Sequence, residues 1–292
     1  MTNVAPSTFL VKNAYRECEK IARSHYENFS IGTLMLPRSI KPDLFAIYAF
    51  CRKTDDIGDA AKGDRLKALD SWEHQVLDFK NTVSKDPILI ALHETIKRFS
   101  IPIVPFLKLI QANRMDQQYV RFQTFKDLEY YCDHSANSVG EMVLHVTESY
   151  SEENLLLSNY TCTALQLTNF LQDVKRDLLM DRIYLPLEDM TRFQYAEEDL
   201  KNSVLNNHFR ELMAFEISRA RLLFESGYGL VERISGKFKL DIALFSRGGL
   251  RILESIENQS FDVFSKRPTI SSREKFQLFV TSLLKMLSRR RP

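Results

Sequence analysis

Residues 151–179, SEENLLLSNYTCTALQLTNFLQDVKRDLL, decide the fold class of this chain. They open a run without glycine or proline that lasts until Pro186. Ser151 is a good helix N-cap, and the two glutamates that follow it place negative charge in the first turn. We therefore predict one long helix over about 152–179, which is apolar enough to be central in the fold.

The rest of the chain shows the same helical character. Glycine and proline number only 9 each in 292 residues, about half the usual share. A second helix is predicted from Pro42, because Leu44, Ile47, Tyr48 and Cys51 follow the spacing of one helical face. Further helices are expected at 8–29, 65–80, 86–99, 103–120, 125–147, 197–204, 207–234, 238–258 and 272–288. No segment alternates apolar and polar residues long enough to form a sheet, so we predict an all-α fold.

Bulk properties exclude several function classes. The 40 basic and 38 acidic residues give a net charge of +2, which is not basic enough for nucleic acid as the main partner. The four cysteines form no zinc or disulfide spacing and indicate a reducing compartment. No signal peptide and no apolar run of about 18 residues is present. We expect a single domain over residues 1–292 and a cytoplasmic location.

A pair of aspartates lies near the end of the helix that begins at Pro42. Asp55 and Asp59 are four residues apart, so they project from the same helical face. Like charges at this spacing repel each other, and the helix C-terminus also disfavours anions. A divalent cation would reverse this balance, because Mg²⁺ prefers carboxylate oxygens, waters and substrate phosphates as ligands.

A second pair repeats this spacing on the long helix. Asp173 and Asp177 are again four residues apart, and Asn169 extends their face by one turn. The surrounding residues are apolar, so we expect these carboxylates to face an internal cavity, where they need cations or hydrogen bonds. The residues alone leave two interpretations open, a metal–diphosphate site or two solvated acidic patches. The basic residues that would balance such patches are Arg52, Lys53, Lys175 and Arg176.

Three segments carry a resemblance to a known family. They are LMLPRSIKPDLFAIYAFCRKTDDIGD (34–59), YYCDHSANSVGEMVLHVT (130–147) and LTNFLQDVKRDLLMDRIYLP (167–186). In order and spacing they resemble the squalene/phytoene synthases. The resemblance implies a single all-α isoprenoid synthase domain, a helical bundle around a central active-site cavity. It also implies Mg²⁺ ions, with Mn²⁺ as a substitute, that bridge the substrate diphosphate to the protein. The implied metal ligands are Asp55, Asp59, Asn169, Asp173 and Asp177.

Within that family, the HYENF (25–29), SANSVGEMVLH (135–145) and NFLQDVKRD (169–177) segments are most similar to hydroxysqualene synthases of the bacterial hopanoid route. That similarity implies conversion of presqualene diphosphate and water to hydroxysqualene and diphosphate, without NADPH. One alternative is a prenyltransferase of the presqualene diphosphate, dehydrosqualene or phytoene type, which condenses two prenyl diphosphates. Another is a non-catalytic helical binding or assembly protein on the same scaffold.

The resemblance also implies roles for single residues. His25 is expected near the diphosphate, and Tyr131 and Tyr184 near the reacting centre. Tyr131 would steady a cation with its ring face or relay a proton, unless it is an ordinary core tyrosine. Asn137 stands where the family has glycine, so we expect it to orient the water that ends the reaction; the alternative is a turn cap.

Basic residues near the acidic motifs are the candidates for diphosphate binding. The candidates, together with one tyrosine, are Arg52, Lys175, Arg176, Arg182 and Tyr184. Arg52 lies one helical turn before Asp55, and its alternative role is a surface ion pair with Asp55 or Asp56. The basic residues beside the second motif have a solvated position as their alternative.

The expected partner is an isoprenoid diphosphate substrate. The C-terminal segment FQLFVTSLLKMLSRRRP (276–292) is amphipathic and ends in three arginines. It is suited to lie on anionic lipid at the inner face of the membrane, or to form a last core helix with a solvated basic end. Association with other enzymes of the squalene pathway is also left open.

Overall fold

The computed structural model describes residues 7–24, 37–60, 62–78, 84–118, 120–234, 236 and 238–288. Two predictions lie outside these residues: the role of His25 with the HYENF segment, and the contribution of the three C-terminal arginines. Within the described ranges no helix is long and apolar enough to cross a membrane.

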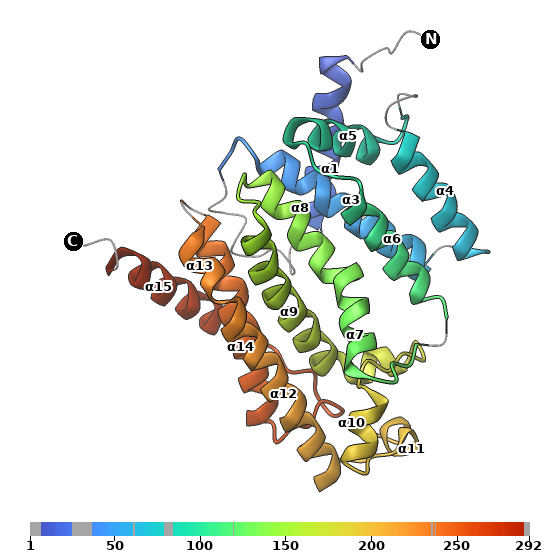
Figure 1. The fold of residues 1–292 in the computed structure, drawn as a ribbon, viewed down its shortest axis with the longest axis vertical. Coiled ribbons are helices and arrows are strands. Elements are labelled where there is room, and N and C mark those ends of the chain that lie inside the picture. Colours follow the sequence, from blue (N-terminus) through green and yellow to red (C-terminus); the bar gives the residue numbers. More distant parts are fainter. Residues whose placement is uncertain are drawn as a thin grey trace. The chain divides into compact units, whose positions relative to one another are not determined.

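The described chain is helical, as predicted (Figure 1). The α-helices are α1 (Thr8–Ser24), α3 (Lys41–Ala60), α4 (Arg65–Leu77), α5 (Pro87–Phe99), α6 (Val104–Met115), α7 (Phe125–Cys132), α8 (Ser138–Val146), α9 (Glu152–Leu178), α10 (Leu187–Arg192), α11 (Glu197–Lys201), α12 (Asn207–Gly227), α13 (Gly229–Arg233), α14 (Phe238–Asn258) and α15 (Ser272–Ser288). The extended pairing in this part of the chain is one isolated parallel bridge between Arg121 and Ile183.

Several helix boundaries differ from the predictions. The helix expected over 125–147 is divided by a π-helix, Asp133–Asn137, and the one expected over 207–234 is divided at Tyr228. The short helix α10 was not predicted. A π-turn adds a residue without changing the apolar character of a segment, so hydrophobic periodicity does not reveal it.

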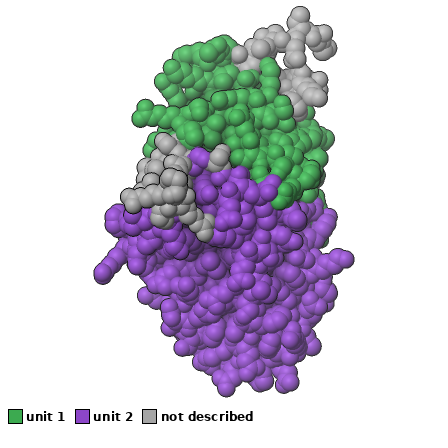
Figure 2. Space-filling model, turned by 60° about the vertical axis from the view of Figure 1, so that its left-hand side comes forward, with its two compact units in different colours: residues 1–118, 138–155 green, residues 119–137, 156–292 purple. Residues whose placement is uncertain are grey.

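Contacts along the chain divide it into two compact units (Figure 2). Unit 1 comprises residues 1–118 and 138–155, and unit 2 comprises residues 119–137 and 156–292. The prediction of a single domain over 1–292 stays a prediction.

The core of unit 1 holds the second half of α3 in place. The Phe50 ring stacks on Trp72 at 6.0 Å and meets the edge of Phe106 at 5.4 Å. Trp72 Nε1 donates to the hydroxyl of Thr54 at 3.0 Å, and that hydroxyl donates to the Phe50 carbonyl at 2.8 Å. These contacts fix the helical turn that comes directly before Asp55.

Most of the long helix α9, from residue 156 on, belongs to unit 2. Its predicted cap is present, because Ser151 Oγ accepts from the Asn154 backbone N–H at 3.1 Å. Helix α12 approaches α9 so closely that a Cβ at Gly227 would lie 2.9 Å from the backbone nitrogen of Thr161. A side chain there would push the two helices apart, which explains the glycine at this crossing.

Candidate active site

The first acidic motif lies in the last turns of α3. Asp55 and Asp59 are both exposed, and Asp55 accepts a hydrogen bond from Nδ2 of Asn113 on α6 at 3.2 Å. This contact requires Gly58, because a Cβ at that position would lie 2.4 Å from Oδ1 of Asn113. The glycine between the two aspartates therefore lets α6 reach the motif.

The electrostatics of this motif favour a cation. Partial loss of water around the carboxylate raises the pKa of Asp55 to about 6, although its hydrogen bond from Asn113 lowers it. The negative charges of Asp59 and Asp116 raise this pKa further, and Arg52 lowers it. Anionic oxygens gathered in this way fit the donor set of Mg²⁺, which binds through one or two carboxylates and takes its other ligands from water and substrate phosphates.

Arg52 makes the ion pair that was its alternative role, and also keeps an unused donor. Its Nη2 lies 2.7 Å from Oδ1 of Asp56, so the contact is with Asp56 rather than Asp55. Its Nε is buried and has no hydrogen-bond partner. A buried guanidinium donor without an acceptor fits a phosphate oxygen well. The geometry is therefore compatible with the predicted diphosphate contact.

The second acidic motif, on α9, has different surroundings. Asn169 is exposed, Asp177 is half-buried and Asp173 is buried. Both oxygens of Asp173 are bound by Arg267, with Nε 2.6 Å from Oδ1 and Nη2 2.7 Å from Oδ2. Arg176 Nη1 lies farther away, 3.5 Å from Oδ1. The buried carboxylate is thus neutralised by a bidentate arginine.

Sequence reasoning missed Arg267. It lies 94 positions after Asp173, and no periodic signal connects the two residues. The rule that a buried carboxylate needs a cation indicates that a partner exists, but it does not say which residue provides it.

Arg267 belongs to a segment that we call the strap, residues 262–268, between α14 and α15. Two further side chains of α9 hold the strap. Lys175 Nζ donates to the carbonyl of Phe264 at 2.7 Å, and Gln172 Nε2 donates to the carbonyl of Pro268 at 2.5 Å. The diphosphate role of Lys175 stays a prediction. In this structure its ammonium group donates to a backbone carbonyl of the strap.

Four buried aromatic rings form a cluster in unit 2. Phe170 and Tyr184 stack almost parallel, with centroids 3.9 Å apart. The Tyr131 ring lies 5.6 Å from Tyr184 and 6.1 Å from Phe170, and Phe122 completes the group at 5.5 Å from Tyr131. The structure therefore brings together the two tyrosines predicted near the reacting centre, with two phenylalanines that were not singled out. The negative faces of such rings stabilise a cation.

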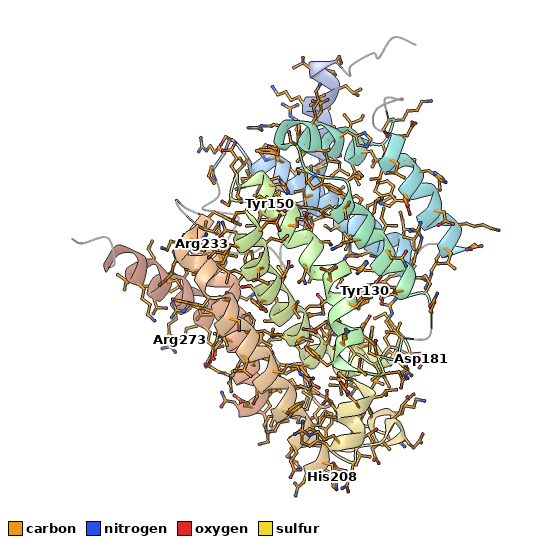
Figure 3. All side chains as sticks on the ribbon, viewed as in Figure 1. Tyr130, Tyr150, Asp181, His208, Arg233 and Arg273 are labelled. Carbon is orange, nitrogen blue, oxygen red and sulfur yellow. The ribbon has the colours of Figure 1, made fainter. Side chains whose placement is uncertain are left out.

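The position of Tyr184 depends on the turn that follows α9. Arg121 is buried there and binds the carboxylates of Asp181 at 2.7 Å and Glu197 at 2.9 Å. Its hydrogen bonds lower the pKa of Glu197 to about 2. Next to this ion pair the backbone N–H of Ile183 donates to the Val120 carbonyl at 3.2 Å. Figure 3 shows Asp181 in this turn, and also Tyr130 on α7.

A small pocket lies beside the aromatic cluster, at the C-terminal end of α9. It is lined by Phe170, Val174, Asp177, Leu178, Arg182, Ile183, Tyr184, Leu185 and Leu200. Arg182 is buried, and its backbone N–H donates to the Asp177 carbonyl at 2.9 Å. Three predicted site residues, the carboxylate of Asp177, the cation of Arg182 and the ring of Tyr184, therefore line one pocket.

Asn137 is the last residue of the π-helix and is buried. Its Oδ1 accepts a hydrogen bond from the hydroxyl of Thr163 on α9 at 3.1 Å. This contact fixes the orientation of the amide, so the side chain joins two helices rather than capping a turn. π-turns occur frequently at functional sites.

The predicted site residues thus fall into three groups. Arg52, Asp55 and Asp59 belong to unit 1, His25 lies outside the described residues, and the others belong to unit 2. Among the described residues, no three His, Cys, Asp or Glu side chains are close enough together to hold a metal by themselves. A metal at either motif would take its remaining ligands from water and substrate.

Comparison with known proteins is consistent with this geometry. The sequence model of the squalene/phytoene synthase family matches residues 22–274. A 15-cis-phytoene synthase of Synechocystis sp. is 34% identical over 281 residues, which cover 91% of this chain and 83% of that protein. The crystal structure of squalene synthase HpnC from Alicyclobacillus acidocaldarius is 37% identical, with a TM-score of 0.84 over 88% of this chain and 97% of that one. A dehydrosqualene synthase in complex with ligand is 30% identical, with a TM-score of 0.87 over 95% and 98%.

Proposed function

We propose a specific reaction for this chain on the premise that it belongs to the squalene/phytoene synthase family. The family comprises all-helical, divalent-metal-dependent enzymes of isoprenoid biosynthesis that act in head-to-head prenyl diphosphate condensation. Our proposal is that this member converts presqualene diphosphate and water to hydroxysqualene and diphosphate, as a carbon–oxygen lyase.

The observation that carries the proposal is the buried Asn137–Thr163 pair. The Thr163 hydroxyl engages the amide oxygen, so the amide NH₂ is turned to a defined side. A fixed polar group in an apolar setting is suited to hold one water molecule while excluding others. A cation that meets an oriented water ends as an alcohol, and no hydride donor such as NADPH is then required.

Ionisation is assigned to the acidic motifs. Asp55, Asp59, Asp173 and Asp177, with Asn169, would hold Mg²⁺ or Mn²⁺, which when bound neutralises the leaving diphosphate. Arg52 would donate its unused Nε to a diphosphate oxygen. Arg182 would add positive charge at the pocket, and Arg176 is a further candidate because its side chain is largely exposed.

The aromatic cluster would then stabilise the carbocation left by the leaving group. The Tyr131 and Tyr184 rings present π faces within one buried group, beside the pocket that Asp177 and Arg182 line. Cation–π attraction grows when the rings are shielded from water. The rings therefore lengthen the life of the cation until water captures it.

A second candidate function is supported by the sequence relatives. The phytoene synthases of two cyanobacteria are 34% and 32% identical to this chain over more than nine-tenths of its length. That similarity favours the alternative in which two prenyl diphosphates are condensed head to head. The 37% identity to squalene synthase HpnC favours a squalene-type over a phytoene-type product, and the buried Asn137 favours the first proposal.

Product analysis distinguishes the two. The purified chain is incubated with Mg²⁺ and no NADPH, either with presqualene diphosphate in H₂¹⁸O or with farnesyl or geranylgeranyl diphosphate alone. We expect ¹⁸O-labelled hydroxysqualene from the first and no consumption of the other two. Phytoene or presqualene diphosphate from the prenyl diphosphates alone would replace our proposal with the second candidate.

The role of Asn137 has its own test. Asn137→Gly should retain ionisation, measured as diphosphate release, but shift products from hydroxysqualene to other hydrocarbons or alcohols, because the water is no longer oriented. Thr163→Val serves as a matched variant that removes only the hydroxyl donor. Unchanged hydroxysqualene yield in both variants would remove Asn137 from the proposal.

A further inference from the structure

Arg267 binds the same carboxylate of α9, Asp173, that is predicted to bind a metal ion. Its guanidinium makes charge-assisted bonds to both oxygens of Asp173, at 2.6 and 2.7 Å. Only 10% of the Asp173 side chain is exposed, against 33% for Arg267. The carboxylate that is predicted to bind a metal is therefore already paired, and its partner has a path to solvent.

The strap keeps its position by contacts other than this ion pair. Lys175 and Gln172 bind two of its carbonyl groups. The Asp262 carboxylate accepts from the backbone N–H of Ser265 at 2.8 Å. The buried Phe264 ring lies 4.7 Å from the ring of Phe209 on α12. The guanidinium can therefore leave Asp173 without releasing the backbone that carries it.

Simultaneous binding of a metal ion and this guanidinium to Asp173 is energetically unfavourable. Two cations on the same carboxylate repel each other, strongly so where the surroundings are partly dehydrated. Mg²⁺ also gives up its waters reluctantly and is usually bound by one or two carboxylates together with substrate phosphates. A bare metal ion would have to displace a bidentate arginine, whereas a diphosphate brings extra ligands for the metal and an alternative acceptor for the arginine.

We propose that Arg267 is a gate that keeps metal off Asp173 until a diphosphate arrives, so that metal loading at the α9 motif depends on substrate. This inference rests on the proposed function, because it takes Asp173 as a metal ligand. Arg267 acts through Asp173 and is a positioning residue. It sets the order in which substrate and metal bind. It also prevents metal from occupying the site when no substrate is present.

Asp55, in the motif on α3, has no bidentate arginine among the described residues. Asp55 accepts from the uncharged amide of Asn113, and the nearby Arg52 pairs with Asp56 instead. A metal without diphosphate therefore displaces no bidentate arginine from Asp55. The gate predicts that metal alone loads the α3 motif before the α9 motif.

Mn²⁺ binding followed by electron paramagnetic resonance tests the gate without any turnover. All proteins carry Asp55→Asn and Asp59→Asn, so that only the α9 motif is measured, with and without inorganic pyrophosphate. In this background Arg267→Gln should bind Mn²⁺ alone about tenfold or more tightly than the parent, the value of a charge-assisted pair. Arg267→Lys retains the charge but not the bidentate geometry, so its Mn²⁺ affinity should lie between those of the parent and Arg267→Gln. The control Arg176→Gln removes an exposed charge 3.5 Å away and is compared with Mn²⁺ alone, because Arg176 is itself a diphosphate candidate. It should then change affinity less than about fivefold.

The outcomes separate the gate from the proposed function. Unchanged or weaker Mn²⁺ binding in both Arg267 variants, or an equal gain in Arg176→Gln, would overturn the gate. Asp173→Asn in the same background should lose the Mn²⁺ that pyrophosphate recruits. If it does not, the assignment of Asp173 as a ligand fails, and the gate fails with it. If only the Arg267 variants fail to respond, Asp173 remains a ligand without a gate.

Discussion

The two acidic motifs have the same spacing and opposite surroundings. Asp55 and Asp59 are exposed near the end of α3, and Asp55 is held by an amide. Asp173 also lies near the end of its helix, α9, but it is buried and bound by Arg267. In the first motif Asp55 is held by an uncharged amide, whereas in the second Asp173 is neutralised by an arginine from a distant segment. Identical sequence spacing therefore predicts a common face, but not a common environment or a common response to mutation.

The largest expected effect comes from removing one carboxylate in each motif. Asp59→Asn and Asp173→Asn should both lower the rate of diphosphate release by about 10²-fold or more, because each removes charge that would hold the metal. Their stabilities should differ. Asp173→Asn leaves Arg267 without its partner and should cost about 1–3 kcal/mol of unfolding free energy.

Asp59→Asn should leave stability within about 0.5 kcal/mol of the parent, since it relieves repulsion on an exposed helix face. Urea unfolding of both variants, followed by circular dichroism, measures the difference. Equal losses of stability would contradict the contrast between an exposed and a buried motif.

A substitution between the aspartates of α3 tests how that motif is held. Gly58→Ala places a Cβ 2.4 Å from Oδ1 of Asn113, so the amide must move away from Asp55. We expect a loss of about 1–3 kcal/mol of stability from the overpacked contact, together with slower diphosphate release.

Gly248→Ala is the matched control, because it lies in α14 and its Cβ would meet nothing within 4 Å. Alanine should raise helix stability there by up to about 1 kcal/mol. Thermal unfolding of both variants provides the measurement. A Gly58→Ala protein as stable as the control would mean that α6 does not need the glycine.

A third expected effect concerns pH and the buried acids of unit 2. Glu216 on α12 and Asp189 on α10 are both buried and share Arg219, at 2.7 and 2.8 Å. Burial, with a further contribution from the charge of Asp189, raises the pKa of Glu216 to about 8, although Arg219 opposes this. The folded protein therefore holds this proton more tightly than the unfolded chain, where the pKa is near 4.5.

The resulting stability is fully present below pH 4.5 and is lost as the pH rises through 8. Glu216→Gln cannot titrate and should flatten the fall in unfolding free energy between these values. Asp241→Asn should flatten it as well, because burial also raises the pKa of Asp241 to about 8. Denaturant titrations at pH 5, 6.5 and 8 measure the slope. A slope unchanged in both variants would contradict the titration of buried acids in this unit.

Local features of the fold were predictable. The bounds of α14 and α15 match the predicted ranges, and Ser151 caps α9 as expected. Each of these depends on residues within one or two turns, so the necessary information is contiguous in the chain. The shared face of each aspartate pair is local in the same way.

The partners of the site residues were not predictable. Asn113 reaches Asp55 across 58 positions, and Arg267 reaches Asp173 across 94. The stacking of Tyr184 on Phe170 depends on the turn that Arg121 holds. Such contacts arise from long-range packing, which no periodicity in the sequence encodes.

By itself the sequence determined the helices, the faces on which the aspartates project and, through three segments, the family. The tertiary structure decided which aspartate is exposed and which is bound by an arginine, where Asn137 finds its partner, and which rings join Tyr131. The reason is physical. Helix formation and side-chain direction follow from interactions within a few residues, whereas burial and charge neutralisation depend on the segments that packing brings together.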